Sequence, residues 1–387
     1  MPRARTSLAA LILVGTGVRV AIALTTPGLR YDIDSWRALR AAFATHPLHF
    51  YGLVNPGQTF HWPYPPGFLP LMLAMGGLSD LFGGFSHLIR LPAIAADAGL
   101  TVAVWHGLGG RASQRTRLAA ASLVALGPVF IVISSYAAQI DAVAILPCVV
   151  AVIVWERAPT GRRALFAGLL IGLGGAIKTV PLVTVLALMP SVRSRRELVI
   201  LLGAAAAVML VSCLPFVLAD AAGVRRILHY QGVPGLGGLS LVLQPGLAAS
   251  WLSYSVPITP LVQFALVDHA SLLNLAVLAA FAAYAASVRL APRPAAALLF
   301  LLLVTFGSGF FFQYLVWVMP FLLLAGYLRS AAALQAVILA PMLIFYAGPW
   351  HAHAIVPLYV GLMLLAWLGW VGGAALLARQ AARSASA

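Results

Sequence analysis

Long apolar segments separated by short polar loops make up almost the whole chain. Runs of mostly apolar residues follow one another from Leu8 to Leu377. About 20 consecutive apolar residues form a helix that can cross the hydrocarbon core of a bilayer. The pattern therefore predicts an all-α polytopic membrane protein, a bundle of about 11 to 13 transmembrane helices with longer loops on one face.

We expect these helices to belong to one integral-membrane domain that covers residues 1–387. The first run is interpreted as an uncleaved helix, because Arg19 interrupts it and no clear cleavage site follows. The runs expected to be regular helices are Ser7–Leu24, Leu88–Leu108, Leu118–Tyr136, Val143–Trp155, Leu198–Leu218, Ser271–Val288, Ala295–Phe306, Phe310–Tyr327, Ala331–Phe345 and Ile355–Leu377.

Two further apolar segments do not fit simple crossings. If Gly67–Phe82 crossed the membrane completely, the arginine-containing loop after Leu108 would lie outside, whereas its charge predicts a cytoplasmic position. We therefore expect Gly67–Phe82 to lie along the membrane surface or to dip into it. Ala164–Pro190 begins and ends beside basic loops, yet is too short for two complete helices. Glycines and a proline around Lys178, the only lysine, predict two half-helices that meet at a break. Non-helical backbone at membrane depth is tolerated only where it lines protein or a water-filled cavity.

Composition and charge support a membrane protein with a defined orientation. The chain is 62% hydrophobic and 9% charged, which is outside the range of soluble domains. The net charge of +15 would suggest nucleic-acid binding in a soluble protein, but the arginines lie mainly in short loops between apolar runs, where basic residues mark the cytoplasmic side. This places a loop at about 26–66 and a second at about 220–255 on the outer face. An alanine- and arginine-rich composition suggests a bacterial plasma membrane.

Acidic side chains are scarce, and two of the nine lie close together. Asp32 and Asp34 follow the first apolar run. Asp34 is the better candidate for the N-cap of an interfacial helix beginning near Ser35, which leaves Asp32 as a candidate base. The pair could instead hold a divalent cation, but we favour no cofactor.

Two more acids lie at or within apolar runs. Asp97 needs a partner inside the membrane, and we favour a structural ion pair with Arg90 or Arg19 over direct catalysis. Asp141 is expected at the outer end of its helix, where substrate binding and helix capping are equally supported.

Other polar groups are expected on the outer face, and two aromatic stretches accompany them. Phe60–Gly67 and Phe310–Trp317 are typical of an interfacial belt, although the prolines of the first stretch favour a sugar-stacking or loop-fixing role. The histidines show no metal-binding spacing of the HExxH type. The candidate substrate-binding residues are Tyr64, Gln139, Asp141, Lys178, Arg225, Arg226, His229, Gln313, Tyr314, His351 and His353.

Six short motifs lie in one order along about Tyr31–Pro320. They are YDIDSWRALRAAF at 31–43, YPPG at 64–67, RLPAIAAD at 90–97, QIDA at 139–142, IKTVPL at 177–182 and FQYLVWVMP at 312–320. In this order they resemble the GT-C superfamily of polytopic glycosyltransferases, especially bacterial mannosyltransferases and the first mannosyltransferase of GPI-anchor assembly. One departure is Ala138, where glycine usually precedes the glutamine.

The resemblance implies a GT-C fold and an inverting hexosyltransferase. The implied donor is polyprenyl-phosphate-mannose or a related hexose, the acceptor is a lipid-linked or glycan hydroxyl, and Asp32 is the implied base, with Asp34 orienting the loop or sharing the acceptor. The alternative is a polytopic transporter or flippase, in which Asp97, Asp141 and Lys178 would line a polar path through the bilayer.

Overall fold

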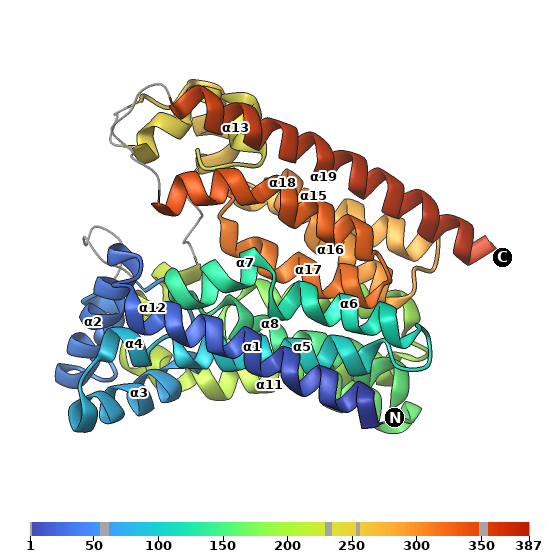
Figure 1. Cartoon of the computed structure of the whole chain (residues 1–387), viewed down its shortest axis with the longest axis horizontal. Helices are drawn as coiled ribbons and strands as arrows, with labels where there is room; N and C mark the ends of the chain where they lie inside the picture. The colour runs from blue at the N-terminus through green and yellow to red at the C-terminus, as the bar shows by residue number, and fades with distance from the viewer. Residues whose placement is uncertain (1, 55–61, 229–233, 253–255, 348–354, 387) are drawn as a thin grey trace. The chain divides into compact units, whose positions relative to one another are not determined.

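The computed structural model describes residues 2–54, 62–228, 234–252, 256–347 and 355–386 of the chain (Figure 1). Those residues are 83% helical and include no strand. The chain packs into two compact units: unit 1 is Met1–Val185 with Val192–Tyr230, and unit 2 is Leu186–Ser191 with Gln231–Ala387. The predicted all-α fold is confirmed, while the expectation of a single integral-membrane domain stays a prediction.

Several helices are suited to crossing a membrane. By length and composition, seven helical stretches of the described residues qualify: Thr6–Thr25, Phe85–Gly107, Gln114–Tyr136, Arg195–Ala219, Ala270–Ser287, Leu328–Tyr346 and Ile355–Arg383. Shorter apolar helices cover Pro66–Phe82, Val180–Ser191, Pro292–Phe306 and Phe312–Leu324. A polytopic membrane protein is confirmed, and the predicted total of about 11 to 13 crossings stays a prediction.

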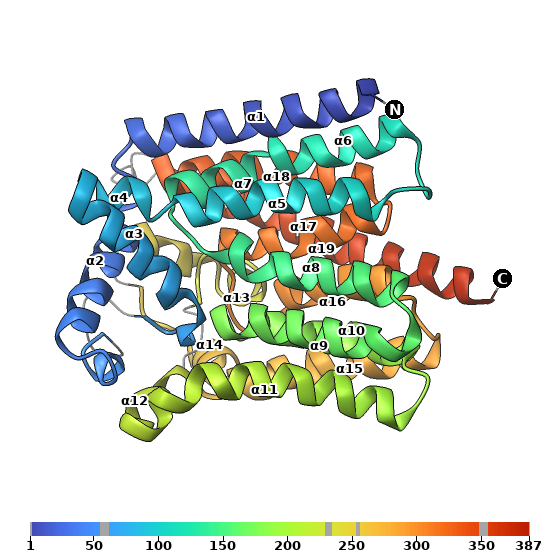
Figure 2. The same ribbon diagram turned by 90° about the horizontal axis from the view of Figure 1, so that it is seen from below.

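Six helices of unit 1 lie side by side in both Figure 1 and Figure 2: α1 (Pro2–Thr25), α5 (Leu91–Gly107), α6 (Gln114–Ala125), α8 (Asp141–Arg157), α9 (Thr160–Ile177) and α11 (Arg195–Ala219). α9 packs between α8 and α11, and α5 packs against α6 and α8. α9 approaches α8 closely at Gly174, where an added Cβ would lie 2.5 Å from the carbonyl oxygen of Ala144. Such close backbone approach is typical of small residues in membrane bundles.

Inside this bundle the predicted ion pair of Asp97 is confirmed, with Arg19 as its partner. Arg19 Nε donates to Asp97 Oδ2 at 2.7 Å, and both side chains are at most 2% exposed. The remaining guanidinium donors bond to carbonyl oxygens of Gly15, Val124 and Ala125. A buried charge needs this complete set of partners, because leaving one unpaired costs several kcal/mol.

The predicted break at Lys178 is also confirmed. α9 ends at Ile177, and Lys178 has extended backbone angles of φ −141° and ψ 141°. Short helical segments then run from Val180 to Ser191.

Four shorter helices lie at the end of unit 1 opposite the N-terminus: α2 (Arg30–Thr45), α3 (Leu69–Phe82), α4 (Phe85–Leu88) and α12 (Ala221–Leu228) (Figures 1 and 2). α3 has 14 residues, a length of about 21 Å, which is shorter than the apolar core of a bilayer. A 3-10 turn at Pro66–Phe68 directly precedes α3, so the helical stretch is Pro66–Phe82, and the expectation that Gly67–Phe82 does not simply cross stays a prediction.

α2 differs from the prediction in where it begins. Its first residue is Arg30, its N-cap is Leu29, and no side chain caps it. The cap predicted for Asp34 is therefore wrong, because Asp34 lies inside the helix. The physical reason is the apolar face of α2, where Ile33, Trp36 and Leu39 are buried and extend the helix upstream of Ser35.

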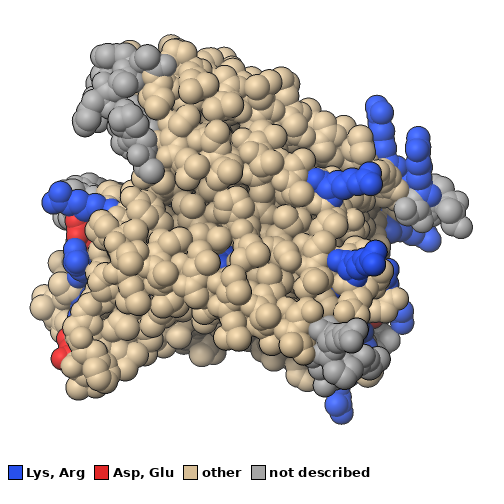
Figure 3. Space-filling view, viewed as in Figure 1, with Lys and Arg blue, Asp and Glu red and all other residues tan. Residues whose placement is uncertain are grey.

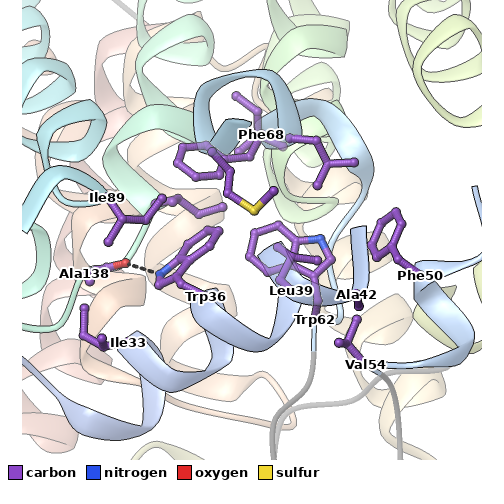
Figure 4. Close-up of a cluster of buried hydrophobic side chains, with 14 of the residues drawn as sticks. Ile33, Trp36, Leu39, Ala42, Phe50, Val54, Trp62, Phe68, Ile89 and Ala138 are labelled. Carbon is purple, nitrogen blue, oxygen red and sulfur yellow. Dashed lines mark hydrogen bonds between the residues drawn. The ribbon is translucent and has the colours of Figure 1, made fainter. Parts of the chain in front are cut away.

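An aromatic cluster holds α2 in place (Figure 4). The ring of Trp36 lies 4.6 Å from that of Trp62 and 5.0 Å from that of Phe68. Trp62 is only 3% exposed. The belt interpretation is thus wrong for the described part of the first aromatic stretch, in which Trp62 fixes the loop to α2. Phe60 and His61 lie outside the described residues.

Unit 2 contains α13 (Leu239–Leu243), α14 (Pro260–Val262), α15 (Ala270–Ser287), α16 (Pro292–Phe306), α17 (Leu315–Leu324), α18 (Leu328–Ala347) and α19 (Ile355–Ser386). Phe300 and Phe321 stack at 5.1 Å between α16 and α17. Phe310, Phe312 and Trp317 are at most 4% exposed. These three side chains form core contacts, so the belt interpretation of the second aromatic stretch is also wrong for them.

Charges on the visible face of unit 1 are distributed unevenly. In Figure 3 the acidic side chains lie mainly at the end that carries α2 and α3, together with basic ones, and further Lys and Arg side chains lie at the end near the N-terminus. At the first end, Arg40 of α2 pairs with Asp80 of α3. The basic end contains Arg111, which pairs with Glu156.

The turn before α2 leads to a stability prediction. Gly28 has φ +77°, and an added Cβ would lie 2.4 Å from Arg90 Nη2. We expect Gly28→Ala to lower the thermal unfolding temperature, because left-handed backbone costs alanine about 1–2 kcal/mol before the clash is counted. Gly17→Ala is the control, since an added Cβ there meets nothing within 4 Å. Equal unfolding temperatures for the two variants in detergent would contradict the prediction.

Candidate active site

Asp32 lies on the first turn of α2, half-buried. Its carboxyl accepts a side-chain hydrogen bond from Gln139 and is close enough to Lys178 and Asp141 to feel both charges. These three partners come from parts of unit 1 more than 100 residues further along the chain. The structure thus brings together four of the residues proposed from the sequence.

Irregular backbone turns Gln139 toward Asp32. α7 (Pro128–Ile131) continues into a π-helical segment, Val132–Tyr136, and Ala138 then adopts a left-handed conformation with φ +57°. π-Helical turns occur frequently at functional sites. The usual glycine before the glutamine has a physical reason here, because glycine adopts positive φ without cost. Trp36 Nε1 donates to the carbonyl oxygen of Ala138 at 3.1 Å and ties this turn to α2.

Lys178 and Asp141 form a buried ion pair beside Asp32. Lys178 Nζ donates to Asp141 Oδ2 at 2.8 Å, and the side chains are 4% and 0% exposed. The ammonium also lies 4.4 Å from the ring centroid of Tyr64, a cation–π contact. Asp141 occupies the first turn of α8, where a negative charge is favoured by the helix dipole. The N-cap of α8 is Ile140 and no side chain caps the helix, so the capping role expected for Asp141 is wrong, and Asp141 acts on its helix and on Lys178 by charge.

Tyr64 is held in place by contacts to both its backbone and its ring. Tyr51 donates its hydroxyl to the carbonyl oxygen of Tyr64 at 3.0 Å, and the Tyr64 ring contacts Trp62 edge-on at 5.0 Å. The loop of residues 62–65 is thereby fixed against the aromatic cluster, which places the Tyr64 ring beside Lys178.

The surroundings of Asp32 change its acidity. Desolvation by the protein raises the pKa of the Asp32 carboxyl to about 7. The hydrogen bond from Gln139 and the charge of Lys178 lower that pKa, and the charge of Asp141 raises it. A carboxyl with a pKa near 7 is suited to general-base catalysis at neutral pH.

Asp34 does not join this group. It forms ion pairs with Arg37 at 2.8 Å and Arg30 at 3.5 Å on its own helix. Side chains two residues apart on a helix do not face each other, so Asp32 and Asp34 are not arranged to share one cation. Among the described residues, no group of three or more His, Cys, Asp or Glu side chains could hold a metal ion.

The remaining predicted residues belong to unit 2 or to α12, or lie outside the described residues. Gln313 is buried in unit 2, and Tyr314 stacks on Trp317 at 4.2 Å there. Arg225 is exposed on α12, and Arg226 belongs to the same helix. His229, His351 and His353 lie outside the described residues.

Two residues near the site were missed by sequence reasoning. Tyr31 lies next to Asp32, and the charge of Asp32 contributes to a raised pKa of the Tyr31 hydroxyl, after desolvation. Trp36 bonds to the turn that carries Gln139. The signal for Trp36 was its spacing from Ile33 and Leu39, which marks one buried helix face.

A model of glycosyltransferase family 87 matches residues 62–312, more than half of the chain. Among solved structures, the chain is similar to the oligosaccharyltransferase of Archaeoglobus fulgidus, with 14% sequence identity and a TM-score of 0.43. That alignment covers 97% of this chain and 55% of the archaeal protein, so the chain spans about 55% of its length. The search of curated proteins found no match.

The raised pKa of Asp32 predicts a pH-dependent stability. Its folded value of about 7 exceeds the ordinary value of 3.8. Between these values the folded state binds a proton that the unfolded state has lost, so this stabilisation is complete below about pH 4 and is lost as pH rises through about 7. We expect the unfolding temperature of Asp32→Asn, relative to wild type, to increase from about pH 5 to about pH 7 and then level off. A difference that is independent of pH would contradict this.

The turn at Ala138 predicts a stabilising substitution. Ala138→Gly removes a left-handed cost of about 1–2 kcal/mol against a loss of about 0.5–1 kcal/mol from greater freedom of the unfolded chain. We expect a net gain of up to about 1 kcal/mol, measured by thermal unfolding in detergent. Ala137→Gly is the matched control, because Ala137 has φ −75° and should lose stability instead. Destabilisation by both glycines would contradict the prediction.

Proposed function

We propose, from the premise that the chain belongs to glycosyltransferase family 87, that it is an inverting hexosyltransferase. The chain is a GT-C glycosyltransferase, as its motifs predicted. The proposed donor is a polyprenyl-phosphate hexose, with mannose as the favoured sugar. The proposed acceptor is a hydroxyl of a lipid-linked or glycan substrate at the outer face of a bacterial plasma membrane.

The observation that carries the proposal is the position of Asp32 beside the buried ion pair of Lys178 and Asp141. A carboxyl with a pKa of about 7 lies within electrostatic reach of a buried ammonium. Sugar transfer from a lipid phosphate needs both groups, a base for the acceptor hydroxyl and a cation for the departing phosphate. Family membership favours transfer over transport.

The proposed reaction is a single displacement. Asp32 accepts the proton of the acceptor hydroxyl. At the same time, the oxygen of that hydroxyl forms a bond to the anomeric carbon of the donor sugar. The bond from that carbon to the phosphate oxygen breaks on the opposite face, so configuration inverts and polyprenyl phosphate leaves with the bonding electrons. Base assistance of this kind is typically worth ~10²–10⁴ in rate.

Lys178 is proposed to stabilise the leaving phosphate. Asp141 and the Tyr64 ring orient its ammonium. The Lys178 side chain is therefore already ordered before the reaction and loses little conformational entropy when the phosphate departs. Arg225 and Arg226 are proposed as further phosphate ligands, and Gln139 as a group that orients the Asp32 carboxyl. His229, Gln313, Tyr314, His351 and His353 stay as proposals for substrate contacts.

The proposed orientation follows from charge. Basic loops mark the cytoplasmic side of membrane proteins. Figure 3 shows Lys and Arg with few acidic side chains at the end of unit 1 remote from α2, whereas basic and acidic side chains lie together at the α2 end. This distribution supports an outer-face location for Asp32.

A substitution at Asp32 tests the proposed chemistry. We expect Asp32→Asn to reduce transfer by about 10²-fold or more, because the amide cannot accept the proton. The assay follows label from polyprenyl-phosphate-[³H]mannose to a new product in membrane lipid extract, and stability of the variant is measured in parallel.

Asp34→Asn is the matched control, since Asp34 lies on the same helix and pairs with Arg37. It should retain most of the transfer activity. Near-normal transfer by Asp32→Asn would remove Asp32 as the base. Transfer from a nucleotide sugar in the absence of the lipid donor would contradict the proposed donor class.

A further inference from the structure

Arg90 is a fully buried cation whose observed partners are backbone and hydroxyl oxygens. It lies at the N-cap of α5 with no exposed surface. Its Nη1 donates to the carbonyl oxygens of Ala23 at 3.2 Å and Ser135 at 3.0 Å, and its Nη2 donates to that of Thr26 at 3.1 Å. The Thr26 hydroxyl is a fourth partner at 3.3 Å. Burying a guanidinium is costly, so this placement requires an explanation.

The partners of Arg90 belong to two segments that lead directly to the site. Ala23 lies in the last turn of α1, and Thr26 directly follows that helix. Four residues later begins α2, on whose first turn Asp32 lies. Ser135 belongs to the π-helical segment that ends three residues before Gln139. Arg90 therefore connects the backbone just before Asp32 to the backbone just before Gln139.

Further contacts strengthen this junction. The N–H of Leu29 donates to the carbonyl oxygen of Tyr136 at 3.0 Å. Gly28 allows Arg90 to approach, because any Cβ there would overlap the guanidinium. On the next turn of α2, Trp36 Nε1 bonds to the carbonyl oxygen of Ala138. Asp32 thus lies between two anchors, one at residues 26–29 and one at Trp36, and both attach to the segment that carries Gln139.

We infer that Arg90 is a positioning residue, which holds the Asp32 carboxylate against the Gln139 amide and Lys178 and so sets its hydrogen bond and its protonation. Arg90 touches no reacting group in this scheme and acts through the backbone. The inference rests on the proposed function only in its catalytic consequence, because the effect on Asp32 protonation can be measured without any substrate.

Asp32 protonation responds to a small set of groups. Among the described residues, Lys178 at the α9 break and Asp141 on α8 act on it by charge, and Gln139 acts by its hydrogen bond. Tyr31 is the titratable neighbour on α2 itself. Loosening the Arg90 junction would let water reach Asp32 and lengthen its bond to Gln139. Desolvation is the largest influence on Asp32, so the net change is a lower ionisation midpoint.

The test compares Arg90→Met and Arg90→Lys with Trp36→Phe, which removes the second anchor but keeps an aromatic ring. Arg163→Gln is the matched control: Arg163 is a buried arginine that pairs with Glu197, and it lies about 22 Å along α9 from Lys178. For each protein, the unfolding temperature is measured across pH with and without Asp32→Asn. The difference in unfolding temperature between the two proteins of each pair, plotted against pH, gives the ionisation midpoint of Asp32.

We expect Arg90→Met and Trp36→Phe to lower that midpoint by about half a pH unit or more, and Arg90→Lys to lower it less. Arg163→Gln should lose stability without moving the midpoint. In the transfer assay, kcat of Arg90→Lys should fall about tenfold or more at neutral pH with little change in KM for the lipid donor.

An unchanged midpoint in Arg90→Lys and Trp36→Phe, with a pH–rate profile that keeps its shape, would overturn the inference and leave Arg90 a residue of stability alone. If Arg90→Met does not fold, those two variants still decide the question. If neither wild type nor any variant transfers sugar, the proposed function fails, whereas the midpoint measurement still tests whether Arg90 positions Asp32.

Discussion

The buried ion pair between Lys178 and Asp141 is the interaction on which the site depends. It joins the beginning of α8 to the end of α9, two helices that pack closely along their length. In a medium of low polarity neither charge is tolerated without the other. The pair therefore fixes the position of the ammonium, and with it the Tyr64 ring and the electrostatic environment of Asp32.

Three polar groups of the site, Gln139, Lys178 and Tyr64, lie where regular helix stops. Gln139 follows a π-helical turn and a left-handed residue, Lys178 occupies an extended break, and Tyr64 lies in a loop. Regular helix would direct its polar backbone groups to one another and its side chains outward. Irregular backbone within a membrane protein must be enclosed by protein or water, and here the aromatic cluster and Arg90 supply much of that enclosure.

Predictions from the sequence succeeded where the residues present were compatible with a single structural explanation. Glycines and a proline around a single lysine left only a broken helix, and Asp97 in an apolar run required a cation. Predictions failed where lipid and protein interior are equally apolar, as for Trp62 and Phe312, because hydropathy does not distinguish a side chain that faces lipid from one that faces a core. The choice of Arg19 over Arg90 depended on three-dimensional packing that no spacing rule contains.

The charge balance explains why Asp32 should ionise near neutral pH if it is the base. When Asp32 is protonated, the three side chains of Asp32, Asp141 and Lys178 carry no net charge. When Asp32 is ionised, the three together carry one negative charge. An anionic lipid phosphate binds better to the neutral group, yet proton abstraction requires the ionised carboxylate. A much lower pKa would repel the donor, and a much higher one would leave too little base. A value of about 7 satisfies both demands, and desolvation by α2 and its surroundings is the means by which this fold reaches it.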